Sequence, residues 1–197
     1  MKTVIADKIA SIAQHLNLKR ELRVSADIPC EEGVVIAAEV LNNKNTYNQL
    51  ELTSGRMALV KKGDIVVGAL GHRKALFGYS GHLPERVAVG DTLQLLNMGG
   101  VIGVCDSINA SFGQPFDARV LGAVLDFPYL GQRIGVPARI GMEQLVAEPV
   151  VATNGVPVVA IAGTCMNSGK TAAACAIVSR LRHHGYTVDA FKATGVS

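Results

Sequence analysis

An apolar run that leads through a glycine-bounded loop into a helical segment constrains this chain more than any other feature. Residues 156–162 are almost entirely apolar and suit a strand buried on both faces. A loop bounded by two glycines follows, and Lys170 and Thr171 come directly after it. Residues 171–184 then show helical periodicity, with Gly185 at the place where a helix stops. The pattern predicts a strand, a loop and a helix in direct succession.

This arrangement meets the requirements for binding a triphosphate. Several backbone N–H groups must converge on the phosphate oxygens, with a helix N-terminus behind them. Glycines permit the backbone angles and the close approach that side chains would block. Lys170 would bring its ammonium group to the β and γ phosphates, and the hydroxyl of Thr171 would be a ligand of the metal. The expected cofactors are ATP and Mg²⁺, and the expected cofactor-binding residues are Gly163, Thr164, Asn167, Ser168, Gly169, Lys170 and Thr171.

The loop resembles that of a known group of nucleotide-binding proteins. Its pattern, Gly-Thr-x-x-x-x-Gly-Lys-Thr, has five residues between the glycines, one more than the standard motif, and is similar to the loop of the dethiobiotin synthetase-like branch of the P-loop NTPases. Residues 185–192 resemble the second strand of that branch, where a lysine at the carboxyl end faces the active site. The resemblance, which covers about residues 156–195, implies this position for Lys192. Ala193 stands where the branch usually has proline, so we do not infer dethiobiotin synthesis.

The resemblance implies an ATP-dependent, ligase-like enzyme in the full-length protein. In that branch ATP typically phosphorylates a carboxylate or carbamate, which an amine then captures. The implied catalytic residues are Lys170, which would stabilise charge on the transferred phosphoryl group, and Lys192, which would hold an anionic substrate. One alternative is a nucleotide-controlled switch or assembly-factor ATPase, whose relatives often carry an early loop lysine that is missing here. The other is a module that binds a small molecule or protein and whose NTPase has decayed.

The sequence before residue 151 has a different pattern of apolar and turn-forming residues. Short apolar runs alternate there with glycine, asparagine, aspartate and proline, which predicts many short strands. The predicted strands include residues 22–28, 34–41, 57–60, 65–70, 92–96, 101–105 and 118–125. Residues 5–18 carry isoleucine and leucine at helical spacing and predict a helix.

We therefore predict a mixed α+β and α/β chain of two parts. Residues 1–150 form a β-rich N-terminal domain, a small barrel or sandwich with one helix. Residues 151–197 form the first β-loop-α-β unit of a P-loop NTPase domain. A nucleotide-binding sheet of this type normally has at least five parallel strands, and it needs an acidic residue that the chain does not supply. We expect this chain to be an N-terminal piece of a longer protein, or to be completed by a second copy, and to hydrolyse ATP very weakly by itself.

Two features of the N-terminal region leave alternatives open. Residues 60–68 and 87–95 resemble each other, each with a Gly-Asp turn between apolar runs, which fits either a duplication or a recurring turn. His72, Arg73 and His82 lie on glycine-rich loops, where they would either bind an anionic ligand or form a solvated hairpin tip.

Composition narrows the functional class. The net charge of +3 over 197 residues is too small to predict binding to nucleic acid or to an anionic membrane. No apolar run reaches the length of a membrane span, and the four cysteines form no Cys-x-x-Cys pair. We expect a cytoplasmic protein with reduced thiols, a nucleotide and a small-molecule substrate as partners, and the capacity to form a homo-oligomer.

Overall fold

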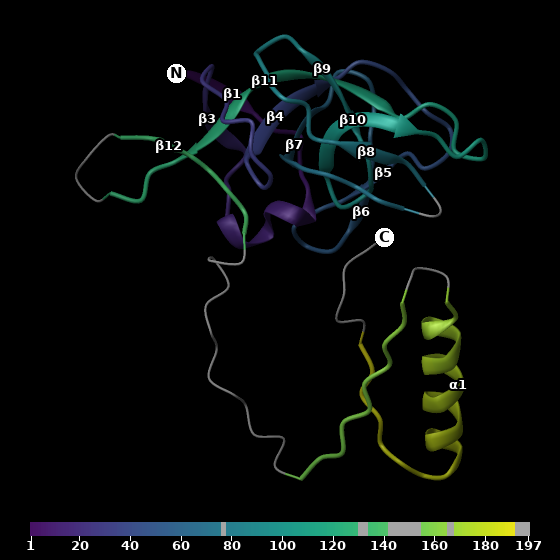
Figure 1. The fold of residues 1–197 in the computed structure, drawn as a ribbon. Coiled ribbons are helices and arrows are strands. Elements are labelled where there is room, and N and C mark those ends of the chain that lie inside the picture. Colours follow the sequence, from purple (N-terminus) through teal and green to yellow (C-terminus); the bar gives the residue numbers. More distant parts are fainter. Residues whose placement is uncertain (76–77, 130–133, 142–154, 165–167, 192–197) are drawn as a thin grey trace. The chain divides into compact units, whose positions relative to one another are not determined.

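The computed structural model describes residues 1–75, 78–129, 134–141, 155–164 and 168–191 (Figure 1). Contacts along the chain divide it into two compact units, unit 1 within Met1–Leu145 and unit 2 within Val146–Gly195. Unit 1 holds all the described strands, whereas the described regular structure of unit 2 is a single α-helix.

The elements of unit 1 are short. In chain order they are β1 (Lys2–Ile5), β2 (Lys8–Ile9), the 3₁₀ helix η1 (Ser11–Leu16), β3 (Glu21–Ser25), β4 (Val35–Val40), β5 (Gln49–Glu51), β6 (Met57–Leu59), β7 (Ile65–Leu70), β8 (Ser80–His82), β9 (Thr92–Leu95), β10 (Val101–Ser107), β11 (Phe116–Asp126) and β12 (Val136–Pro137). The β-rich N-terminal region that the sequence predicts is confirmed, and β7 has the predicted bounds.

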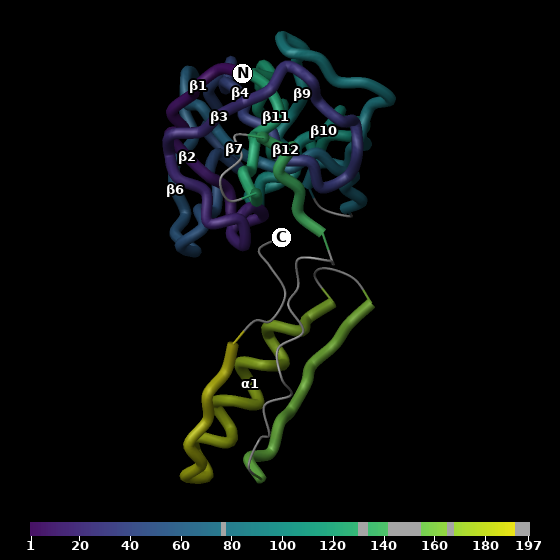
Figure 2. The backbone as a smooth tube through the Cα atoms, turned by 90° about the vertical axis from the view of Figure 1, so that its left-hand side faces the viewer, coloured from purple at the N-terminus to yellow at the C-terminus, as the bar shows by residue number. Residues whose placement is uncertain are grey.

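Most of these strands join one mixed sheet. Its order is β1–β3–β11–β4–β7–β10–β8, with β2 beside β7 and β12 beside β11. Because β9 pairs with both β10 and β11, the pairings β11–β4–β7–β10–β9 close into a ring, and these strands lie together in both views (Figure 1, Figure 2). β2 and β10 run parallel to β7, and β4 runs antiparallel to it. That this sheet belongs to a small barrel or a sandwich stays a prediction.

The central strands are mostly apolar, and β7 is apolar throughout, because both faces of the sheet are covered. Successive side chains of a strand point to opposite faces. Ile36, Val66 and Leu70 belong to one apolar cluster, whereas their neighbours Val35 and Val67 belong to a second. All five side chains are completely or almost completely buried. The continuous apolar runs of the sequence therefore mark strands that lie between two cores.

The helix predicted over residues 5–18 is wrong. Residues 2–5 form β1, which pairs antiparallel with β3, and Lys8–Ile9 form β2, so that only Ser11–Leu16 turn as a 3₁₀ helix. The isoleucines do not share a face, since Ile5 is 62% exposed and Ile9 is buried. Pairing with distant strands decides the structure here, and it outweighs a helical spacing that arises by coincidence.

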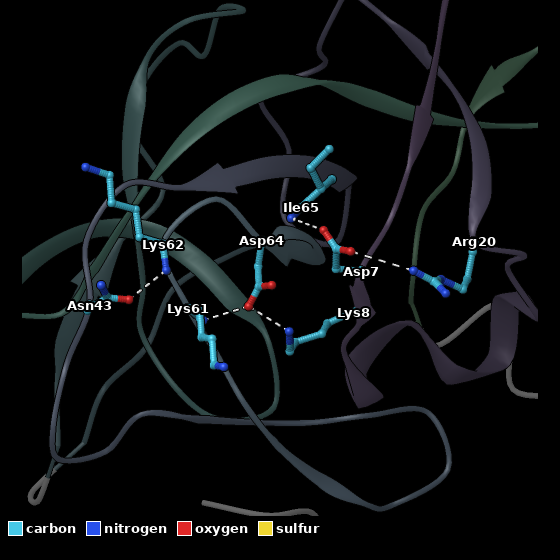
Figure 3. A network of polar contacts seen from close by, with 8 residues as sticks. All are labelled: Asp7, Lys8, Arg20, Asn43, Lys61, Lys62, Asp64 and Ile65. Carbon is cyan, nitrogen blue, oxygen red and sulfur yellow. Dashed lines mark hydrogen bonds and ion pairs between the residues drawn. The ribbon is translucent and has the colours of Figure 1, made fainter.

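A network of charged side chains fixes β2 on the sheet (Figure 3). One carboxylate oxygen of Asp64 accepts hydrogen bonds from the ammonium of Lys8 and from the backbone N–H of Lys61, both at 2.6 Å. Asp7 accepts the N–H of Ile65 at 2.9 Å and pairs with Arg20 at 3.6 Å. Asp7 therefore holds the start of β7.

The two similar segments of the sequence form turns with the same hydrogen bonds. In the first turn the Asp64 carboxylate accepts the N–H of Lys61, and Val40 donates to the carbonyl of Asp64 at 2.9 Å. In the second, the Asp91 carboxylate accepts the N–H of Ala88, and Val120 donates to the carbonyl of Asp91 at 2.8 Å. The preceding glycines both have positive φ, 90° and 96°, which favours glycine at these positions.

Unit 2 contains the helix α1 (Lys170–His183), close to the predicted bounds. Gly185, at φ 85°, stops it: its N–H donates to Arg182 and the N–H of Tyr186 donates to Leu181, which together satisfy the last carbonyl groups. The strands predicted over residues 156–162 and 185–192 are not found among the described residues of unit 2. A strand needs a hydrogen-bonded neighbour, and no described segment pairs with either one.

Candidate functional site

The glycine-bounded loop enters α1 through a left-handed residue. Gly169, the residue before the helix, has φ 86° and ψ 5°, a left-handed backbone conformation that residues other than glycine rarely adopt. Its carbonyl accepts the N–H of Ala173 at 2.9 Å and so begins the helical hydrogen bonds. The helix then starts at Lys170, as the Gly-Lys-Thr pattern requires.

The two ends of the loop lie against each other. A Cβ atom at Gly163 would come within 2.5 Å of the Ser168 hydroxyl oxygen and within 3.0 Å of the Lys170 side chain, so a larger residue there would displace these two side chains. Lys170 extends back along the loop, and its ammonium donates to the Ser168 hydroxyl at 3.1 Å. The side chain of Lys170 therefore lies beside Gly163, the first glycine of the loop.

The start of α1 is electrostatically suited to an anion. No side chain among the described residues caps the helix N-terminus, and its first turn contains no acidic residue. The first backbone N–H groups of a helix have no partner within it, and the helix dipole adds a partial positive charge there. Arg180, Arg182 and His183 lie in the last turn, where cations are favourable.

The residues present fit Mg²⁺ that is held mainly by a nucleotide. Thr171 is exposed in the first turn of α1, and its hydroxyl can supply one oxygen ligand. Mg²⁺ takes six oxygen ligands and usually keeps phosphate oxygens and waters among them. Asp189 is the only carboxylate among the described residues of unit 2, and no group of three or more metal-binding side chains occurs in the described part of the chain.

Two predicted site residues lie outside the described residues. These are Asn167, in the loop, and Lys192, the second expected catalytic lysine. The other predicted residues are described: Gly163, Thr164, Ser168, Gly169 and Thr171 are exposed, and Lys170 is half-buried.

Arg73 has a structural environment that neither sequence interpretation anticipates. It is 8% exposed, and its guanidinium donates to the backbone carbonyls of Tyr79 (3.1 Å) and Leu96. It is therefore neither part of a solvated hairpin tip nor available to an anionic ligand. The two histidines have other partners: His72 accepts the N–H of Leu83 at 3.4 Å, and His82 pairs with Asp106 at 2.7 Å. Within the described part of unit 1, no side-chain hydrogen bond or ion pair joins either histidine to Arg73.

Lys44 is a charged residue that sequence analysis missed. Its ammonium donates to the Tyr79 hydroxyl and to the carbonyls of Phe112 and Gln114, and it lies 4.7 Å from the centre of the Tyr79 ring. Burial lowers the pKa of Lys44 to about 8 and raises the pKa of Tyr79 to about 12. The partners are 35 and more residues away in sequence, so the polar run around Lys44 carries no signal of them.

Neither the cysteines nor the helices add a further functional signal among the described residues. The described cysteines, Cys30, Cys105 and Cys175, are free thiols. Among the described helices, none combines the length and the apolar character needed to cross a membrane. Comparison with protein-family models, with curated proteins and with solved structures finds no match, so the function has to be inferred from the residues themselves.

Proposed function

We propose that this protein binds Mg·ATP through the loop from Gly163 to Thr171. The observation that carries the proposal is the geometry at the loop's end: a left-handed Gly169, a helix start that no described side chain caps and a lysine side chain that lies against Gly163. Each of these features serves a polyphosphate. The glycines let the backbone approach it, the N–H groups bind its oxygens and the lysine compensates its charge.

The roles of the residues follow from their positions. Backbone N–H groups at the start of α1 would bind phosphate oxygens, and Lys170 would exchange its Ser168 contact for the β and γ phosphates. Thr171 would hold Mg²⁺, which neutralises charge on the phosphates when it is bound. Positioned positive charge of this kind stabilises the transferred phosphoryl group in the transition state.

For the reaction, we propose an ATP-dependent ligase-like enzyme that acts on a carboxylate or an amine. Lys192 would hold the anionic substrate, and the β-rich unit would bind a substrate or regulate the reaction. The support is the Gly-Thr-x-x-x-x-Gly-Lys-Thr pattern and its following lysine. A switch or assembly-factor ATPase would need a protein partner in place of a small substrate, and a decayed NTPase would not bind ATP.

A titration with a fluorescent ATP analogue tests nucleotide binding. We expect Lys170→Ala to weaken binding at least about tenfold, because charged hydrogen bonds to phosphate are lost. Thr171→Ala should reduce the dependence on Mg²⁺. Arg182→Ala, which removes a positive charge at the other end of α1, is the matched control and should bind like the wild type. Equal affinity of the wild type and Lys170→Ala would exclude the proposed site.

A further inference from the structure

An open pocket with a volume of about 440 Å³ lies in unit 1, in the range of small-molecule sites. It is found where β4 begins, β7 ends and β10 begins. Its apolar residues are Ile12, Leu70, Val101 and Ile140, and its polar ones are Glu32, His72 and Arg139. No described residue of the loop from Gly163 to Thr171 lines this pocket.

Backbone hydrogen bonds hold the walls of the pocket in place. The N–H of Gly33 donates to the carbonyl of Leu70 at 2.8 Å, and the carbonyl of Gly33 accepts the N–H of Ile140 at 2.9 Å. These bonds join the wall formed by residues 139–141 to the pocket floor, which Gly33, Leu70 and Gly71 form. The N–H of Ile12 donates to Gly99 at 3.1 Å and fixes the opposite wall. A pocket framed in this way is largely formed before a ligand binds, which reduces the entropy cost of binding.

Two glycines line the pocket for different reasons. Gly33 is required by the backbone, since its φ is +88° and a Cβ atom would lie 2.2 Å from the carbonyl oxygen of Ile140. Gly71 does not have a positive φ, and a Cβ atom there would make ordinary contacts with Val101 at 3.6 Å and with Glu32 at 3.7 Å. The backbone at Gly71 would accept a side chain, and a large one would extend into the pocket.

The charges in the pocket leave one carboxylate without a partner. Arg139 donates to Glu31 at 2.5 Å, so its charge is already balanced. His72 accepts the N–H of Leu83 through Nδ1, so this nitrogen is already engaged. Glu32 makes no hydrogen bond or ion pair within the described residues, and its carboxylate lies over Gly71 in contact distance of the pocket floor. The unbalanced charge is therefore negative.

We propose that this pocket binds a small primary amine with an aliphatic body. The ammonium group would pair with Glu32, and the aliphatic part would lie against Ile12, Val101 and Ile140. The choice of an amine follows from the pocket alone and holds whether or not unit 2 binds a nucleotide.

A series of six-carbon probes with different head groups tests the charge preference. We would titrate hexylamine, hexanol and hexanoate into the ¹⁵N-labelled chain at neutral pH, without nucleotide, and follow the amide signals of Gly33, Gly71 and Gly141. We expect hexylamine to bind with a dissociation constant on the order of millimolar, because the probe is small and the carboxylate is exposed. Hexanoate should bind at least about fivefold more weakly.

Three variants show whether the pocket itself is responsible. Glu32→Gln should weaken hexylamine binding about fivefold and leave hexanol unchanged. Gly71→Leu should abolish binding of all the probes, while Glu85→Gln, at an exposed acid outside the pocket, should have no effect. The proposal is overturned if hexylamine produces no shift at these glycines, if hexanoate binds as well as hexylamine, or if Glu32→Gln binds hexylamine like the wild type. Since no nucleotide is present, these outcomes are independent of the test of ATP binding.

Discussion

At the scale of single residues, the ammonium of Lys44 has the most unusual environment in the described part of the chain. Its hydrogen bonds tie the 42–48 segment to the loop before β11, while burial beside aromatic rings lowers its pKa to about 8. The unfolded chain would hold this proton up to about pH 10.5. Between these two values the unfolded state binds more protons than the folded state, so this group makes the fold more stable as the pH rises.

We therefore predict that the stability difference between wild type and Lys44→Met depends on pH. The free energy of unfolding of the wild type should gain about 1 kcal/mol relative to the variant between pH 7.5 and pH 9.5, a figure reduced for partial exposure. Urea unfolding followed by circular dichroism across this range measures it. Burial raises the pKa values of Cys30 and Cys105, and both thiols act in the opposite direction near pH 9 in the two proteins. Because the charge of Lys44 lowers the pKa of Cys105, its removal raises that pKa further in the variant and adds to the expected difference. Parallel pH profiles for wild type and Lys44→Met would contradict the prediction, and Lys62→Met, on an exposed turn, serves as the control.

At the scale of elements, the two Gly-Asp turns form a matched pair with unequal surroundings. Both carboxylates accept a backbone N–H, but Asp64 also accepts the ammonium of Lys8, and the two side chains of that ion pair are only 15% and 17% exposed. Breaking a pair that is largely removed from water leaves a charge without compensation, which costs more than the loss of an exposed hydrogen bond.

We predict that Asp64→Ala lowers the free energy of unfolding by about 3 kcal/mol and Asp91→Ala by about 1 kcal/mol. Chemical denaturation of both variants measures the difference. A double variant with Lys8→Met should recover part of the loss at Asp64, because the unpaired ammonium is removed as well. If Asp64→Ala and Asp91→Ala lower the free energy of unfolding by the same amount, the Lys8–Asp64 ion pair adds nothing to the stability of the turn.

The elements also show what could be predicted from the sequence. The strands of the central sheet were predictable, because a run such as Ile65–Leu70 is buried on both faces and therefore apolar throughout. The N-terminal strands were not, since their register depends on β3 and β7, whose pairing leaves no mark in the local spacing of isoleucines. In the same way, local patterns do not show that Arg73 is buried, because tertiary packing decides this. They do not show the partners of Lys44 either, because these partners are distant in sequence. The start of α1 at Lys170 was predictable, because the glycine before it and the helical spacing after it can be read from consecutive residues.

At the scale of the whole molecule, burial is distributed very unevenly between the two units. Every fully buried apolar side chain among the described residues belongs to unit 1, and α1 buries none. The apolar run of unit 2 is exposed, with Val158 at 74%, and Phe191 is 90% exposed. Since helices in proteins are stabilised mainly by packing, α1 has little of the support that holds β4 and β7.

This difference predicts how amide hydrogens exchange with solvent in the intact chain. The amides of β4 and β7 should exchange only when unit 1 unfolds, whereas those of α1 should exchange at least about a hundredfold faster, through local opening. Hydrogen exchange measured by NMR resolves both sets in one experiment. Mg·ATP should then slow exchange at the first turn of α1, around Thr171, and leave β4 unchanged, because the ligand binds the folded helix start. Protection of α1 equal to that of β4 without nucleotide would mean that the helix is covered by contacts other than those described.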